Sequence, residues 1–389
     1  MKMKKFINYY LFAMIIAVTA VSFASCSDDD DDNSSEERDL LLGEIISQYV
    51  NNTVYVTYEN LADASIKLEE ACIALQNDPT NLQKATKATE VWKDARLYWE
   101  LSEAFLFGPA SKKGIDPHID TWPLDQANLD KLLNSPSIME DFDADYATNN
   151  LQGGSLGFHA IEYVLFKDSK PRTDASENEL KYAVGVAGDL KLQCLILEAA
   201  WKGMDNITDE KKEYLEEAEA EQDDEWGENL MNAGLPGSTY KTKVSALHEI
   251  ISGDKGCFGI ANEVGNTKIA DPVASNNVLD VESWFSWNSK QDFQDNIRGI
   301  YNSCMGGVDG KRNENKSIYS YVKSFNPDLA EKLKDAMIET IGSDNKTGIG
   351  TIIQPFRNNL EKSKNQVAMD TCNDLCDVLR EVADAISNQ

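Results

Sequence analysis

The sequence predicts an all-α protein made of two helical bundles. Apolar residues recur at spacings of three and four through most of the chain, which is the period of an amphipathic helix. Sustained alternation of apolar and polar residues is almost absent, so few strands are expected. A Gly-Leu-Pro-Gly stretch at 234–237 marks a boundary, and the segments 92–109 and 287–307 are both aromatic-led helices closed by a glycine turn. We therefore expect one bundle over 39–235 and a second over 236–389.

The first bundle begins with a helix over 39–75, whose apolar residues keep the helical period. Asn-Asp-Pro-Thr at 77–80 ends this helix and starts the next, because proline is tolerated in a first turn. The second helix covers 81–107 and stops at Gly-Pro at 108–109. An irregular loop that contains two prolines is expected over 110–125.

Further helices follow along the chain, separated by stretches that contain glycine, proline or asparagine. The strongly acidic stretch 207–226 is interpreted as a solvated helix or an insertion. The other expected helices cover 155–166, 177–201, 239–251, 258–266, 293–304, 317–324, 326–341 and 351–387.

The composition restricts the kinds of partner. The chain has 389 residues and a formal net charge of -29, so nucleic acid and anionic lipid headgroups are poor partners. Six cysteines lie beyond Cys26 and could pair in an oxidising compartment, but the sequence does not fix their pairing. No CxxC or Cys/His zinc spacing is present, which argues against a structural zinc site.

The amino-terminal segment is typical of a lipoprotein. Three lysines precede an apolar run over 6–21, as in a secretory signal peptide. Small residues then lead to Cys26, so we expect 1–25 to be removed and Cys26 to be lipidated, which anchors the protein in the outer membrane. The apolar run is short for a transmembrane helix. A soluble secreted protein with a chance cysteine is the alternative.

An acidic spacer follows the lipid-bearing cysteine. Residues 26–38 carry a run of aspartates and glutamates, and a block of like charge cannot collapse, so a disordered tether is expected. Ser27 followed by several acids resembles the export signal of surface lipoproteins in some Gram-negative lineages. This resemblance favours display on the cell surface, with a periplasm-facing lipoprotein as the alternative.

A histidine and a glutamate form the most informative pair. His159 and Glu162 are three residues apart on an expected helix and therefore share one face. Such a pair can ligate one metal ion, or the carboxylate can orient the imidazole. A hydrogen bond on the helix surface is the alternative. Apolar neighbours and nearby glycines favour a packed position for this helix.

A second group of candidates surrounds the end of the second helix. Glu103 lies among aromatic residues at a helix C-terminus, where the helix dipole disfavours an anion. It therefore needs a counter-charge, either a metal ion or a salt bridge with Arg96 or Lys93. Asp116 and Asp120 follow in the adjoining loop and are further candidates for the same site.

A third group lies between aromatic residues near 284–287. Glu282, Ser286 and Asp292 are candidates for binding a ligand. Ser289 and Asp292 also stand near the start of the helix expected at 293, so capping of that helix is the favoured role for these two.

Three stretches together resemble the imelysin-like family. They read SEAFLFGP with DPHIDTWPLD, then GFHAIEYVLF, then ESWFSWNS with QDFQDNIRGIYNSCMGG. The GxHxxE signature of the family is intact at Gly157, His159 and Glu162. The third stretch departs from many relatives, which carry a threonine-histidine pair where this chain has Ser289-Lys290. That difference removes a possible second histidine ligand.

The resemblance carries expectations about fold and function. It implies two all-helical domains with the signature facing a cleft between them. It also implies an extracytoplasmic protein often associated with iron acquisition, and the family name derives from a reported peptidase activity.

The leading hypothesis is a lipoprotein that binds a metal ion, or a ligand that bears one, in metal uptake with partner proteins. Imidazole and carboxylate ligands together suit iron, zinc or manganese, so the ligand types do not fix the metal, and iron or zinc is expected. His159, Glu162 and Glu103 are the predicted ligands. A zinc-dependent peptidase is one alternative, and a surface adhesion or scaffold module is another. The candidates for lining the cleft are Arg96, Asp116, Asp120, Glu282, Ser286 and Asp292.

Overall fold

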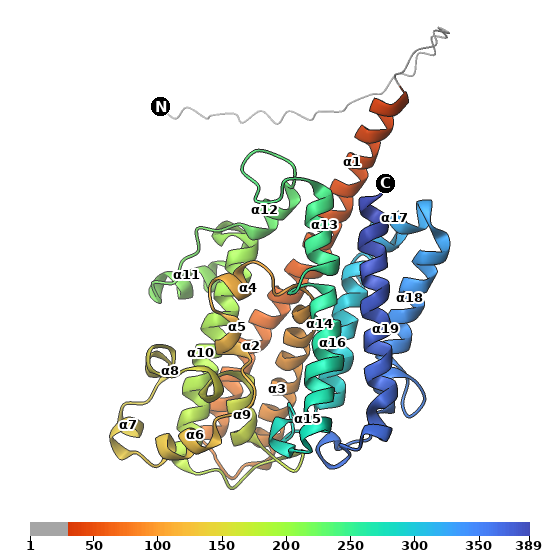
Figure 1. The fold of residues 1–389 in the computed structure, drawn as a ribbon. Helices are drawn as coiled ribbons and strands as arrows, with labels where there is room; N and C mark the ends of the chain where they lie inside the picture. Colours follow the sequence, from red (N-terminus) through yellow and green to blue (C-terminus); the bar gives the residue numbers. More distant parts are fainter. Residues whose placement is uncertain (1–29) are drawn as a thin grey trace, which may run out of the picture. The chain divides into compact units, whose positions relative to one another are not determined.

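The computed structural model describes residues 30–389, and within them the chain is almost wholly helical. The predicted signal peptide and Cys26 lie outside the described residues. In the described part, the only strands are β1 (Phe166–Lys167) and β2 (Lys170–Pro171), which form a short antiparallel pair. The prediction of an all-α fold is confirmed (Figure 1).

The helices of the first half follow the expected order. They are α1 (Asp30–Tyr49), α2 (Tyr55–Gln76), α3 (Leu82–Ser102), α4 (Pro109–Lys112), α5 (Asp116–Ile119), α6 (Gln126–Leu133), α7 (Pro136–Glu140), α8 (Ala144–Asn150), α9 (Gly157–Leu165), α10 (Glu177–Lys202), α11 (Asp209–Glu217) and α12 (Trp226–Met231).

The second half contains fewer but similarly long helices. They are α13 (Lys243–Ser252), α14 (Cys257–Glu263), α15 (Ala270–Ser275), α16 (Ser289–Cys304), α17 (Ile318–Phe325), α18 (Pro327–Ile341) and α19 (Lys362–Ser387). Two π-helical segments, η1 (Val50–Val54) and η5 (Val264–Ile269), and seven short 3-10 segments complete the described residues: η2 (Glu103–Phe105), η3 (Gly153–Ser155), η4 (Met204–Asn206), η6 (Val278–Asp280), η7 (Glu314–Lys316), η8 (Gly348–Thr351) and η9 (Phe356–Asn358).

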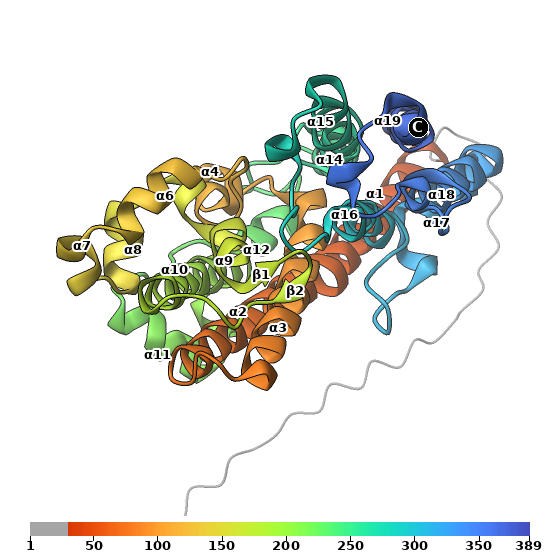
Figure 2. The ribbon, with the colours of Figure 1, turned by 90° about the horizontal axis from the view of Figure 1, so that it is seen from below.

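The helices pack in two groups that share one core. In the first group α2 packs against α3 and α10, and in the second α19 packs against α14 and α18 (Figure 2). Helix α16 packs on both α3 and α18 and so joins the groups. Residues 39–389 form one compact unit, with a single large cluster of buried apolar side chains through both groups. The two groups are therefore joined, because α3 and α16 bury their apolar faces against each other.

Several boundaries differ from those expected. Helix α1 begins at Asp30, inside the stretch 26–38 that was expected to be a disordered tether. The acidic stretch 207–226 is helical over α11 and at Trp226, where α12 begins, and Lys211 and Leu215 of α11 are buried rather than solvated. Residues 352–355 and 359–361 are not helical, so α19 is shorter than expected.

The described residues contain neither a disulfide nor a helix suited to span a membrane. The six cysteines beyond Cys26 are all buried free thiols, so their role is packing. Within residues 30–389, no helix is both long enough and apolar enough to cross a membrane.

Candidate metal centre

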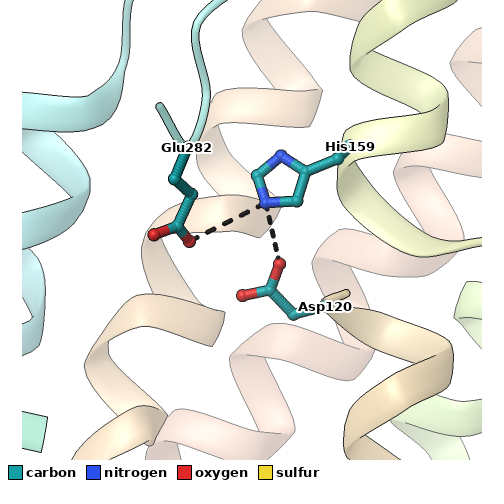
Figure 3. A group of neighbouring side chains, drawn as sticks. All are labelled: Asp120, His159 and Glu282. Atoms are coloured by element: carbon teal, nitrogen blue, oxygen red, sulfur yellow. Dashed lines mark ion pairs between the residues drawn. The ribbon is translucent and has the colours of Figure 1, made fainter. Parts of the chain in front are cut away.

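Three side chains from distant parts of the sequence converge at one point (Figure 3). Asp120 follows α5, His159 lies in the first turn of α9, and Glu282 follows η6. One potential ligand atom from each lies within 4.8 Å of the other two. The His159 Nε2 atom is 2.9 Å from Asp120 Oδ1 and 3.7 Å from Glu282 Oε1. We call these three residues the triad.

Gly157 explains how α9 brings His159 to Asp120. Its φ is +72°, and a Cβ atom there would lie 2.1 Å from the backbone oxygen of Ile119. Only glycine permits this close approach at a positive φ. The start of α9 therefore rests directly on the backbone before Asp120. The glycine of the signature thus positions two residues of the triad.

Glu162 orients the imidazole of His159. The Nδ1 atom of His159 is 3.1 Å from Glu162 Oε2, and the other oxygen of Glu162 accepts a hydrogen bond of 2.7 Å from the backbone N–H of Ser286. Both carboxylate oxygens are thus engaged on the side of the ring away from the triad. A histidine with a proton on Nδ1 would donate to Glu162 and direct its Nε2 lone pair toward Asp120 and Glu282.

Aromatic side chains fix the remaining geometry. The indole N–H of Trp99 donates to Asp120 Oδ2 at 2.8 Å, which leaves Oδ1 facing His159. The ring of Trp122 packs edge-on against the imidazole at a centroid distance of 4.7 Å. His159 is fully buried, so its orientation is set by protein groups.

Arg96 provides the first fixed positive charge beside the triad. It lies on α3 and is fully buried. Its guanidinium is 2.8 Å from Asp120, 3.6 Å from Asp292, and in contact with Glu100 and Glu282. One arginine therefore faces four carboxylates.

Lys268 provides the second fixed positive charge. Its Nζ atom lies 2.9 Å from Glu103 Oε2, 3.1 Å from Glu282 Oε1 and 3.9 Å from Glu100 Oε2. The side-chain amide of Asn296 donates to Glu100 at 2.5 Å and to Glu103 at 2.6 Å. We call Glu100, Glu103 and Glu282 the lysine-binding carboxylates.

Two of the lysine-binding carboxylates, Glu100 in α3 and Glu103 in η2, have raised pKa values. Burial outweighs the attraction of Lys268 and raises the pKa of Glu103 to about 8. Burial likewise raises the pKa of Glu100 well above its usual value, although Arg96 and Lys268 both lower it. Burial therefore opposes ionisation of both carboxyls.

The residues of the triad are charged. Burial would raise the pKa of Asp120, but Arg96 and His159 hold it well below its usual value. Burial also opposes ionisation of Glu282, yet Lys268, His159 and Arg96 lower its pKa to about 2. Burial and Arg96 lower the pKa of His159, but Asp120 and the hydrogen bond to Glu162 outweigh them and hold it well above its usual value. A metal ion at Nε2 would replace the proton on that nitrogen.

The donor atoms of the triad fit a metal ion. His159 Nε2 and Asp120 Oδ1 are buried and lie 2.9 Å apart without a hydrogen bond between them, and Asp120 Oδ1 is otherwise paired with Arg96 at 2.8 Å. One imidazole nitrogen with two carboxylate oxygens is a ligand set that iron, zinc or manganese accepts.

An acidic cavity opens beside the triad. Its volume is about 920 Å³, and Asp120, Glu282 and Trp122 border it. Seven carboxylates and two lysines are among the lining residues, so the cavity attracts cations. The charged residues of the lining are Glu103, Asp116, Asp120, Lys255, Glu263, Lys268, Asp271, Asp280 and Glu282.

The structure arranges the predicted ligands differently from the sequence-based prediction. His159 lies in the triad. Glu162 lies behind the His159 ring, which is the alternative in which the carboxylate orients the imidazole instead of ligating the metal. Glu103 is held by Lys268 and not by Arg96 or Lys93. Asp116 borders the cavity, where burial raises its pKa to about 6.

The capping role expected for Ser289 and Asp292 is wrong. Helix α16 begins at Ser289, four residues earlier than expected, and Asn288 precedes it without a side-chain capping bond. The Ser289 hydroxyl instead donates to the Glu282 carbonyl at 2.5 Å, and Asp292 is buried beside Arg96. Both residues therefore hold the loop that carries Glu282 against the rest of the centre.

Sequence reasoning missed two residues of the centre, Glu100 and Lys268. Glu100 could have been found, because it lies four residues after Arg96 and three before Glu103 and so shares their helix face. Lys268 carried no comparable signal, since its neighbours form no recognisable motif.

Comparison with known proteins finds relatives that are similar over most of the chain. Iron-regulated protein A of Synechococcus elongatus is 27% identical over 337 residues, which cover 85% of this chain and 82% of that protein. A crystal structure from Parabacteroides distasonis, named as an iron-regulated protein A precursor, matches with a TM-score of 0.76 at 27% identity and covers 90% of this chain and 95% of the other. An imelysin-like protein from Psychrobacter arcticum shares the fold, with a TM-score of 0.58 at 13% identity over 90% of this chain and 94% of its own. The family model described as Imelysin matches residues 54–385, and the chain belongs to the imelysin family.

Proposed function

We propose that this protein binds a single metal ion through Asp120, His159 and Glu282 and serves in metal acquisition rather than in peptide cleavage. The observation that carries the proposal is the approach of three ligand atoms to within 4.8 Å in a buried centre beside an acidic cavity. Glu162 has the supporting role, because a carboxylate behind a ligating histidine fixes its tautomer and ring orientation.

Iron is the metal that the names of the relatives suggest. Two similar proteins bear the name iron-regulated protein A. The ligand set itself accepts Fe²⁺, Mn²⁺ or Zn²⁺, so the choice among them depends on supply as well as on affinity. The cavity beside the triad is large enough for a hydrated ion or a small metal-bearing ligand.

His159→Ala tests the site. In the full chain carrying Cys26→Ser, we expect one equivalent of Fe²⁺ (under anaerobic conditions) or Zn²⁺ to bind. His159→Ala should weaken binding by about 100-fold or more, and Glu162→Gln by roughly 10- to 100-fold, because the latter removes only an orienting partner. Isothermal titration calorimetry measures both changes.

The matched control is His248→Ala. His248 lies on α13, where its ring contacts Ser252 and Ser387 outside the centre, so its loss should leave metal affinity unchanged. Equal binding by His159→Ala and the parent would reject the assignment of the site. If the parent cleaves peptides in a zinc-dependent way and Glu162→Gln does not, the protein is a peptidase rather than a binding protein.

We also propose that the protein is an outer-membrane lipoprotein held through Cys26 and exposed on the cell surface, where it would meet metal-uptake partner proteins. The support is the lipobox with its acidic spacer. Cys26→Ser should move the protein from the membrane fraction to the soluble fraction and abolish fatty-acid labelling. Retention of label and membrane association by the variant would contradict the anchor.

A further inference from the structure

Lys268 is a buried lysine surrounded by carboxylates. Its side chain is 7% exposed, and its ammonium lies between 2.9 and 3.9 Å from one oxygen of each lysine-binding carboxylate. Glu100 and Glu103 come from the end of α3 and from η2, whereas Glu282 comes from the loop after η6. The ammonium is thus enclosed as a bound cation would be.

A π-helical segment carries Lys268. The segment η5 joins α14 to α15, and Lys268 is its fifth residue. A π-helical turn changes the direction of the side chains that follow it and occurs frequently at functional sites. The neighbouring Gly265 lets this segment pack closely on α19, because a Cβ there would lie 2.8 Å from the Cβ of Cys372. The backbone is therefore shaped to deliver this lysine to the carboxylates.

The surroundings of Lys268 hold more acceptors than the ammonium uses. Asn296 Oδ1 is buried and has no hydrogen-bond partner, and Glu100 Oε1 faces Arg96 rather than Lys268. Asn296 also donates to Glu100 and Glu103 and so holds both carboxylates in place. Oxygen donors of this kind are the ligands of hard divalent cations.

Glu282 connects this position to the triad. Its Oε1 atom lies 3.1 Å from Lys268 Nζ and 3.7 Å from His159 Nε2. Two-metal centres hold their ions about 3.5–4 Å apart between shared ligands. A carboxylate that faces both the triad and Lys268 is the group that would bridge such a pair.

We propose that Lys268 fills a second cation position, formed by Glu100, Glu103 and Glu282, so that the centre holds one metal ion beside a built-in ammonium. This inference rests on the proposed metal site and adds a reason for its single occupancy. The lysine prevents a two-metal arrangement, which is the arrangement that activates water in many hydrolases. The centre is accordingly built for holding one ion.

Lys268→Met tests the inference with Mn²⁺ as the probe, in the full chain carrying Cys26→Ser. The parent should bind one equivalent with the six-line electron paramagnetic resonance spectrum of an isolated ion. Lys268→Met should bind two equivalents with a spin-coupled spectrum, because the vacated carboxylates then take a second ion. Lys268→Arg keeps the charge and should bind one, and Lys268→Met with Glu100→Gln should bind the second ion at least about 10-fold more weakly.

Each outcome decides the inference. If Lys268→Met unfolds without metal, Mn²⁺ should restore its folding, and Lys268→Gln provides a second variant for the same titration. One equivalent in both the parent and the lysine variants would overturn the inference and leave the triad as the metal site. If the parent binds no Mn²⁺ and Lys268→Met binds one equivalent, the triad is rejected as a metal site and the second cation position is retained. Absence of binding in every variant would overturn both.

Discussion

Arg96→Ala should lower the free energy of unfolding by about 3–5 kcal/mol, which is the usual result of removing one partner from a buried ion pair. Arg96 is fully buried and contacts or approaches Glu100, Asp120, Glu282 and Asp292. Without it, these carboxylates would remain in a low-dielectric interior with only Lys268 and His159 as counter-charges. Chemical denaturation of the variant and the parent measures the difference.

The cost of Arg96→Ala should also depend on pH. Burial already raises the pKa of Asp292 to about 6 with Arg96 beside it, and loss of the arginine would raise it further. When the pKa of a carboxyl is higher in the folded than in the unfolded protein, the free energy of unfolding falls as the pH rises above the unfolded pKa. The free energy of unfolding of the variant should therefore lie further below that of the parent at about pH 8 than at about pH 5.

Lys332→Ala is the matched control for loss of one positive charge. Lys332 pairs with Glu381 on the surface, and both side chains are about half exposed. Its removal should change stability by less than about 1 kcal/mol. An Arg96→Ala variant as stable as Lys332→Ala would show that the buried charges are already compensated without the arginine.

Gly157→Ala should lower the free energy of unfolding by about 2–4 kcal/mol, through backbone strain together with overpacking. Gly157 has a φ of +72°, and the added methyl group would meet the Ile119 carbonyl oxygen at 2.1 Å. The start of α9 must then move away from the backbone that precedes Asp120. We expect His159 and Asp120 to separate, so metal affinity should fall together with stability.

Gly114→Ala separates strain from overpacking. Gly114 has a similar φ of +69°, but no atom lies within 4 Å of its added Cβ. The Gly114→Ala variant should lose only about 1–2 kcal/mol of its free energy of unfolding and keep the metal affinity of the parent. Denaturation and metal titration of the two alanine variants give the comparison. Equal effects on both quantities would contradict a positioning role for Gly157.

Much of the fold follows from local pattern. The helical period, the Asn-Asp-Pro-Thr break and the glycine turns predict α3, α10, α18 and the end of α2 to within a few residues, whereas the helix expected over 39–75 is divided into α1 and α2 by the π-helical segment η1. These signals are local, because each depends on which residues neighbour one another along one helix. Sequence reasoning failed where packing decides, as at α16, whose early start is supported by the Ser289 bond to the Glu282 carbonyl.

The sequence by itself determined the family, the all-α class and the pairing of His159 with Glu162, since an i,i+3 spacing places both on one helix face. Only the tertiary structure decided that Asp120 and Glu282 face the imidazole, that Glu162 lies behind it, and that Lys268 is held by Glu103. These contacts join segments with no fixed relation along the chain. They arise because α9 rests on the backbone before Asp120, and because α3 and α16 share one core.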